Sequence, residues 1–162
     1  MRLLSILIAL GSLALALGTQ ARAQDSAKAA RIVFVCEHGS VKSLVAMEYF
    51  NRGAKARGVP YRAVARGTTP ESTVPTAVRE GLRSDGFDVS AFEPSKLEAS
   101  DVAHAALIVS FDQDVASVVG TQSRYSKWDD LPGVLTDYAR GKDEIVRHVD
   151  ALIEELVRGK LP

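Results

Sequence analysis

The chain has 162 residues, with 20 Lys and Arg against 20 Asp and Glu, a single Cys and a formal net charge of zero. This balance argues against nucleic acid and anionic membrane surfaces as partners, because such partners select basic chains. One cysteine excludes an internal disulfide and a cysteine-rich metal site. No cluster of His, Cys and carboxylate residues has the spacing of metal ligands.

Residues 1–23 are predicted to form a signal peptide. Arg2 provides a positive start, residues 3–18 are almost wholly apolar, and Ala21 and Ala23 are the small residues that cleavage requires. An uncleaved membrane anchor is the alternative, because the apolar run approaches the length that spans a bilayer. Cleavage would give a periplasmic or secreted protein with no stable membrane association.

Residues 24–30 are predicted to be a linker, and residues 31–160 are long enough for one domain with its own core. The first element of the domain is a strand over 31–35. Its almost wholly apolar sequence is typical of a strand buried on both faces of a parallel sheet. A helix is predicted over 44–57 from apolar residues at helical spacing, and Gly58 ends it.

The middle of the domain repeats this alternation. A second strand is predicted over 59–67 and a second helix over 74–86, with Gly86 as its C-terminal stop. Residues 87–97 are expected to be mostly irregular. A third buried strand is predicted over 104–111 from its apolar run.

A short helix is predicted over 112–119 and a polar loop through Trp128 and Pro132. The last helix is predicted over 137–159, where apolar residues recur at intervals of three and four. Strands that alternate with helices predict a parallel sheet covered by helices on both faces.

The single cysteine stands at the end of the first predicted strand, in the stretch "RIVFVCEHGSVKSLV". A loop that runs from the carboxyl end of such a strand into a helix presents free N–H groups and the positive end of the helix dipole. That field binds anions and favours the thiolate form of a cysteine. We therefore expect Cys36 to be a nucleophile, with Ser43 donating a hydrogen bond to the sulfur and Lys42 adding positive charge. A buried, inert thiol is the alternative.

These residues carry a resemblance to a known family. The stretch "VFVCEHGSVKS" resembles the C-x5-R-[ST] signature of the low-molecular-weight protein tyrosine phosphatases and of the thioredoxin-coupled arsenate reductases that share their fold. The segments "ARGTTPESTVP", "AVREGLRSDGFDVS" and "KWDDLP" are similar to later parts of the family pattern, in the same order. The resemblance covers nearly all of residues 31–158. It implies a three-layer α/β sandwich with a short parallel sheet of about four strands.

The resemblance also implies a mechanism, in which Cys36 attacks phosphorus and forms a cysteinyl-phosphate. Asp130, or else Asp129, would protonate the leaving oxygen and then act as the base for the water that hydrolyses the intermediate. Asp137 is a further candidate for this role, and no metal or cofactor is implied. The phosphate oxygens would be held by the loop after the cysteine, formed by Glu37, His38, Gly39, Ser40, Val41, Lys42 and Ser43.

The loop departs from the family pattern at Lys42, where the motif has arginine. Arginine grips two phosphate oxygens through a planar fork, whereas lysine offers a point charge, so transition-state binding should weaken. We expect Arg66 to replace the fork, because it stands at the end of the second predicted strand, where the family has a small residue. Gly39 stands where the family often has Asn, and both residues tolerate a positive φ.

Three functions fit these features. The first is an exported phosphatase-like hydrolase of phosphomonoesters, acting on a phosphorylated small molecule or a phosphoprotein. The second is a non-catalytic protein that binds phosphate or another tetrahedral oxyanion. The third is an arsenate reductase-like protein, which would need an external thiol because the chain has no second cysteine.

Overall fold

The computed structural model of the chain describes residues 29–120 and 124–161, which include four parallel strands in one sheet, in the order β2-β1-β3-β4. The predicted signal peptide lies outside the described residues, so its cleavage stays a prediction. The strands are β1 (Ala30–Cys36), β2 (Tyr61–Gly67), β3 (Ala105–Phe111) and β4 (Tyr125–Trp128). The helices are α2 (Lys42–Ala56), α3 (Thr76–Ser84), α4 (Ala99–His104), α5 (Ala116–Val119) and α6 (Tyr138–Val157).

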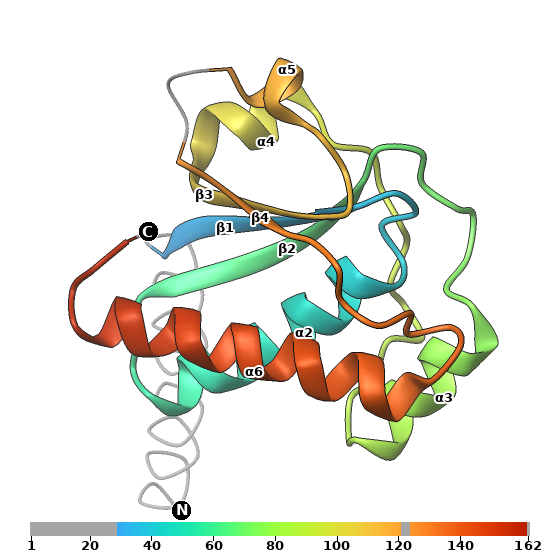
Figure 1. Cartoon of the computed structure of the whole chain (residues 1–162). Coiled ribbons are helices and arrows are strands. Elements are labelled where there is room, and N and C mark those ends of the chain that lie inside the picture. The colour runs from blue at the N-terminus through green and yellow to red at the C-terminus, as the bar shows by residue number, and fades with distance from the viewer. Residues whose placement is uncertain (1–28, 121–123, 162) are drawn as a thin grey trace, which may run out of the picture.

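The sheet is the middle layer of a three-layer sandwich, with α2, α3 and α6 on one face and α4 and α5 on the other (Figure 1). Each face has its own apolar core, the first around Phe34 and Ile153 and the second around Val35 and Ile108. Because successive side chains of a strand point to opposite faces, β1 needs apolar residues throughout its centre. Residues 32–35 are indeed fully buried. The α/β fold class predicted from the sequence is therefore confirmed.

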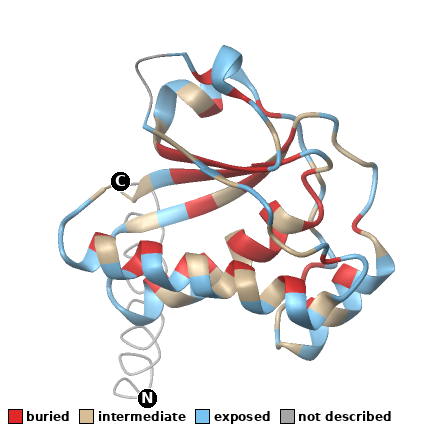
Figure 2. Ribbon diagram, viewed as in Figure 1, coloured by how far each residue is buried: buried red, intermediate tan, exposed pale blue. Residues whose placement is uncertain are grey.

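Burial follows the layers. Buried residues lie along the strands and on the sides of α2 and α6 that face the sheet (Figure 2). In α6 they include Ile145, Val149, Leu152 and Leu156, which are positions at the helical spacing noted in the sequence.

The sequence predicted a polar loop where β4 lies, and this prediction was wrong. This strand is only four residues long and lies at the edge of the sheet, so it has no continuous apolar run to reveal it. It is held instead by Trp128, whose ring lies 5.8 Å from Phe34 and 5.6 Å from Phe111. The short helix α4 was not predicted either, and it begins with a capping box between Glu98 and Asp101.

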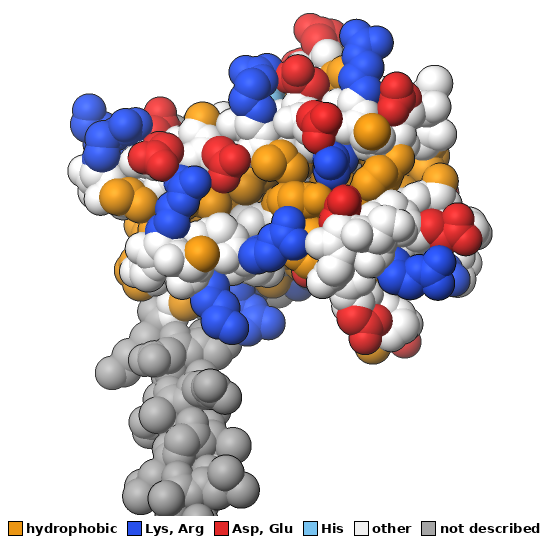
Figure 3. All heavy atoms as spheres, turned by 90° about the horizontal axis from the view of Figure 1, so that it is seen from below, with side chains coloured by type: hydrophobic (Ala, Val, Ile, Leu, Met, Phe, Trp, Pro, Cys, Tyr) orange, Lys and Arg blue, Asp and Glu red, His pale blue; other side chains and the backbone are white. Residues whose placement is uncertain are grey.

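The face formed by α2, α3 and α6 carries basic and acidic side chains interspersed, with apolar side chains between them (Figure 3). Within residues 29–120 and 124–161, no helix is both long enough and apolar enough to cross a membrane.

Candidate active site

The site lies at the carboxyl edge of the sheet, where β1 ends at Cys36 and α2 begins at Lys42. The first turn of α2 is anchored in the core by Leu44 and Val45, both fully buried. Val41, the residue before the helix, makes no capping hydrogen bond through its side chain. The first turn of α2 also contains no acidic residue. The N–H groups of this turn therefore remain available to another acceptor.

The loop between Cys36 and Lys42 is held by the segment that follows β2. The N–H groups of Thr68 and Thr69 donate to the carbonyls of Cys36 and Glu37, at 3.0 and 2.8 Å, and that of Glu71 donates to His38 at 3.2 Å. These bonds occupy the carbonyls of the first three residues of the loop and fix its path.

Two glycines let the loop and β2 approach closely. Gly39 has a φ of 69°, which glycine adopts at little cost. A Cβ on Gly39 would lie 2.8 Å from the nitrogen of Gly67, and a Cβ on Gly67 would lie 2.9 Å from the nitrogen of Gly39. Main chain therefore packs on main chain here, and neither position has room for a side chain.

The sulfur of Cys36 receives two polar contacts from within the loop. The N–H of Gly39 donates to Sγ at 3.3 Å, and Ser43 Oγ lies 3.1 Å from it. Cys36 is 6% exposed and Ser43 is fully buried. A hydrogen bond to a charged acceptor is stronger than one to a neutral acceptor, so both groups are placed to stabilise negative charge on the sulfur. The predicted contact between Cys36 and Ser43 is present.

The remaining loop amides are free to bind an anion. The main-chain N–H groups of Glu37, His38, Ser40 and Val41 have no acceptor among the described residues. They lie beside the start of a helix of 15 residues, where the dipole is positive. A loop with its carbonyls bonded elsewhere and its N–H groups unmatched suits a tetrahedral oxyanion.

A cavity of about 210 Å³ opens beside this loop. Its polar lining includes Cys36, Glu37, His38, Lys42, Asp112 and Gln113, and the rest of its lining is formed by Val41, Phe111, Gly133, Val134 and Leu135. Cys36 and the loop that follows it therefore face the same open cavity.

Lys42 lines the cavity, but its ammonium group is bound to the protein. Nζ donates to Oδ2 of Asp112 at 2.5 Å and to the carbonyl of Leu131 at 2.8 Å, and the side chain is 14% exposed. Asp112 follows β3 directly and has a φ of 55°, an uncommon value for a residue with a side chain. Lys42 thus ties the loop before α6 to the end of β3.

Arg66 does not replace the missing arginine fork, so the expectation drawn from the sequence was wrong. Arg66 pairs with Val35 in the sheet register, and Val35 belongs to the core on the α4 face, whereas Cys36 belongs to the opposite core. The guanidinium instead forms a bidentate ion pair with Asp101 of α4, through contacts of 2.8 and 2.9 Å. The alternation of side chains along β2 therefore turns Arg66 away from the anion loop.

None of the aspartates proposed as general acid lines the cavity. Asp129 is paired with Lys127 at 2.9 Å, and Asp137 caps α6 by accepting from its main chain. Asp130 has a φ of 60° and forms no hydrogen bond or ion pair with the described residues. Residues 133–135, which lie between Asp130 and Asp137 in the chain, form part of the cavity wall.

Three polar residues near the loop were missed by the sequence reasoning. Glu71 accepts a hydrogen bond from Ser40 at 2.8 Å and lies 3.9 Å from His38. Asp112 and Gln113 follow β3 at the same sheet edge as Cys36. The rule that ligands bind at the carboxyl ends of parallel strands would have found these last two.

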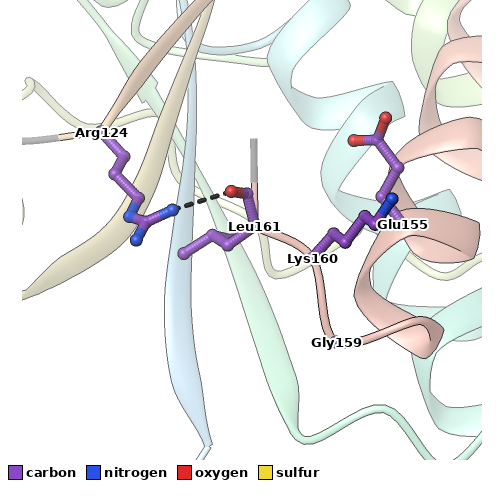
Figure 4. Close-up of a pocket in the computed structure, with 5 residues that line it drawn as sticks. All are labelled: Arg124, Glu155, Gly159, Lys160 and Leu161. Atoms are coloured by element: carbon purple, nitrogen blue, oxygen red, sulfur yellow. Dashed lines mark hydrogen bonds between the residues drawn. The ribbon is translucent and has the colours of Figure 1, made fainter.

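A larger cavity of about 540 Å³ lies at the opposite, amino edge of the sheet (Figure 4). It is lined by Arg124, Glu155, Gly159, Lys160 and Leu161, and Arg124 donates to the carbonyl of Leu161 at 2.7 Å. Its lining has no Cys, Ser or Thr, so the thiol chemistry points to the smaller cavity at Cys36.

Solved structures share this fold at low sequence identity. The crystal structure of YfkJ from Bacillus subtilis matches with a TM-score of 0.72 and 15% identity, over 82% of this chain and 98% of that one. A low molecular weight protein tyrosine phosphatase from T. tengcongensis matches at 0.67 and 22%, over 77% and 98%. An arsenate reductase in its phosphate-binding state matches at 0.66 and 16%, over 78% and 98%.

No curated protein matches the chain. The family model described as low molecular weight phosphotyrosine protein phosphatase matches residues 31–159, nearly the whole predicted domain. This match confirms the resemblance noted from the cysteine loop. The chain therefore belongs to the low molecular weight phosphotyrosine protein phosphatase family.

Proposed function

We propose that this chain is an exported phosphatase that hydrolyses phosphomonoesters through a cysteinyl-phosphate on Cys36. The family supports a cysteine-dependent phosphatase in general. The observation that carries the proposal is the sulfur of Cys36, contacted by the Gly39 N–H and by Ser43 Oγ beneath a loop of unmatched amides. Export rests on the leader sequence of residues 1–23.

In the first step, the thiolate sulfur forms a bond to phosphorus while the bond from phosphorus to the ester oxygen breaks. The leaving oxygen takes a proton from a carboxylic acid. In the second step, that carboxylate removes a proton from water, the water oxygen bonds to phosphorus, and the sulfur leaves as thiolate. The loop amides hold the equatorial oxygens through both steps.

We assign the acid role to Asp130. Asp112 lines the cavity, but its carboxylate is engaged in an ion pair with Lys42 at 2.5 Å. Asp130 has no partner among the described residues and is joined to Leu131, whose carbonyl is bound by Lys42 at 2.8 Å. Residues 133–135, which follow Asp130 closely in the chain, line the cavity.

One observation favours a second function, the non-catalytic binding of an oxyanion. The ammonium group of Lys42 is bound by Asp112 and Leu131, so no side-chain cation of the cavity lining is free to bind the equatorial oxygens. Main-chain amides alone can bind the ground-state anion, but they stabilise the transition state less than an arginine fork does.

The test is hydrolysis of an aryl phosphate by the wild type, Cys36→Ser and Lys42→Arg, with the affinity for inorganic phosphate measured on each. Turnover that disappears in Cys36→Ser supports the phosphatase. Phosphate binding without turnover supports the binding protein, and turnover gained in Lys42→Arg would identify what the lysine removed. Product release that depends on an added thiol would instead favour the arsenate reductase-like function.

Export has its own test. The proposal predicts that the protein recovered from the producing cell begins at Gln24, which intact mass spectrometry can establish. A mass that still includes residues 1–23 would show that the leader is retained.

A further inference from the structure

Resting on this proposed function, we infer that Glu37 makes the site selective for phosphomonoesters that carry a positive charge close to the phosphate. The inference comes from the charges and surfaces that line the cavity of about 210 Å³. It names a substrate class, which neither the family nor the cysteine chemistry determines.

The cavity lining has little net positive charge. Its lysine, Lys42, is neutralised by Asp112 at 2.5 Å, and no arginine is part of the lining. The other charged side chain of the lining is Glu37, which pairs with no lysine or arginine of the described residues. A phosphate in the loop therefore has the Glu37 carboxylate as an unneutralised neighbour.

The immediate surroundings of Glu37 do not cancel its charge. Its carboxylate lies 3.8 Å from His38, and the same imidazole lies 3.9 Å from Glu71. Two carboxylates thus share one histidine, and this rim stays net negative even when His38 is protonated. The side chain of Glu37 is 58% exposed, so it can turn toward a group at the cavity mouth.

The remaining walls suit the body of an ester group. Val41, Phe111 and Val134 are buried apolar residues, and Leu135 at the mouth is 53% exposed. The cavity volume corresponds to about seven water molecules, enough for a phosphate and part of its ester. An ester whose apolar part lies on these walls places its next polar group at the mouth, beside Glu37.

The amides of the loop attract the phosphate, whereas Glu37 repels it. A cation on the substrate offsets the repulsion between Glu37 and the phosphate, because it is attracted to both groups. Carboxylates beside the phosphate of a substrate would add to the repulsion from Glu37.

The test compares two phosphotyrosine peptides of equal length, one flanked by Lys and one by Glu, binding to the Cys36→Ser protein. Binding is measured by calorimetry, so the result does not depend on turnover. We expect the Lys-flanked peptide to bind about fivefold more tightly at low salt, since contacts between exposed charges are individually weak. The ratio should shrink at about 0.5 M salt.

Glu37→Gln in the same background should bring the ratio close to one, whereas the matched control Glu155→Gln, at the opposite edge of the sheet, should keep it. Equal binding of both peptides by the Cys36→Ser protein would overturn the inference. Binding of neither peptide would overturn it too. If the wild type hydrolyses aryl phosphate through Cys36 but the two peptides bind equally, the inference about Glu37 fails and the phosphatase proposal stands. If the Lys-flanked peptide binds more tightly as expected but aryl phosphate is not hydrolysed, the phosphatase proposal fails and the inference about Glu37 stands.

Discussion

The hydrogen bond between Ser43 and Cys36 offers the most direct test of the proposed reactivity of this thiol. Ser43 Oγ lies 3.1 Å from the sulfur, and Ser43 is fully buried in the first turn of α2. Water therefore cannot easily replace the hydroxyl when it is removed. The Ser43→Ala variant should leave the sulfur with the Gly39 N–H as its remaining donor.

The size of the effect follows from the contact. A hydrogen bond to a charged group contributes about 1.5–3 kcal/mol, and the lower value applies because the Gly39 contact remains. A loss of about 1.5 kcal/mol of stabilisation of the anionic sulfur corresponds to a roughly tenfold lower rate of a reaction in which that anion attacks.

The assay is the rate of alkylation by iodoacetamide at about pH 6, because the thiolate is the reacting species. Ser43→Ala should react about tenfold more slowly than the wild type. The matched control is Ser40→Ala, which removes a hydroxyl that is equally buried but donates to Glu71 instead. Equal rates for Ser43→Ala and the wild type, or equal slowing by both variants, would refute the reasoning.

Three further predictions follow from the same geometry. Gly67→Ala should weaken phosphate binding at least tenfold, because its Cβ meets main-chain atoms of the loop at 2.9 Å. The control Gly58→Ala, which has open space but a φ of 65°, should lower stability and leave phosphate binding by the folded protein unchanged. Asp130→Asn should lower kcat about 10²-fold or more for an alkyl phosphate and less for nitrophenyl phosphate, since a good leaving group needs less protonation. Asp101→Asn should lower the free energy of unfolding by about 2–3 kcal/mol in urea titrations, because it leaves the partly buried Arg66 without its carboxylate.

The Asp101 variant also has a pH signature. Burial alone would raise the pKa of Asp101, but hydrogen bonds from Arg66 and from the Glu98 N–H outweigh it and hold the pKa below its ordinary value. A carboxyl with a lowered folded-state pKa stabilises the protein above its unfolded pKa of about 3.9, and this contribution is lost as the pH falls through the folded value. The stability difference between wild type and Asp101→Asn should therefore be full at about pH 6 and shrink below about pH 4. A difference that stays constant down to about pH 2 would contradict this account.

The cysteine loop was predictable because its properties are local. A buried strand, a short loop with Gly39 and the start of an amphipathic helix follow one another in the sequence, and this order alone places Cys36 beside free amides. The same holds for β1, whose unbroken apolar run reports burial on both faces. The edge strand β4 was missed because a strand of four residues with half-exposed side chains has no such run.

The sequence by itself determined the fold class and the order of strand, loop and helix around Cys36, because each follows from periodicity or from neighbours along the chain. Only the tertiary structure decided where the charges act. It turned Arg66 to the other face of the sheet, bound Lys42 to Asp112, which is 70 positions away, and kept Asp129 and Asp130 off the cavity lining. The physical reason is that ion pairs depend on distances through space, and a linear pattern does not contain the partners that compete for a charge.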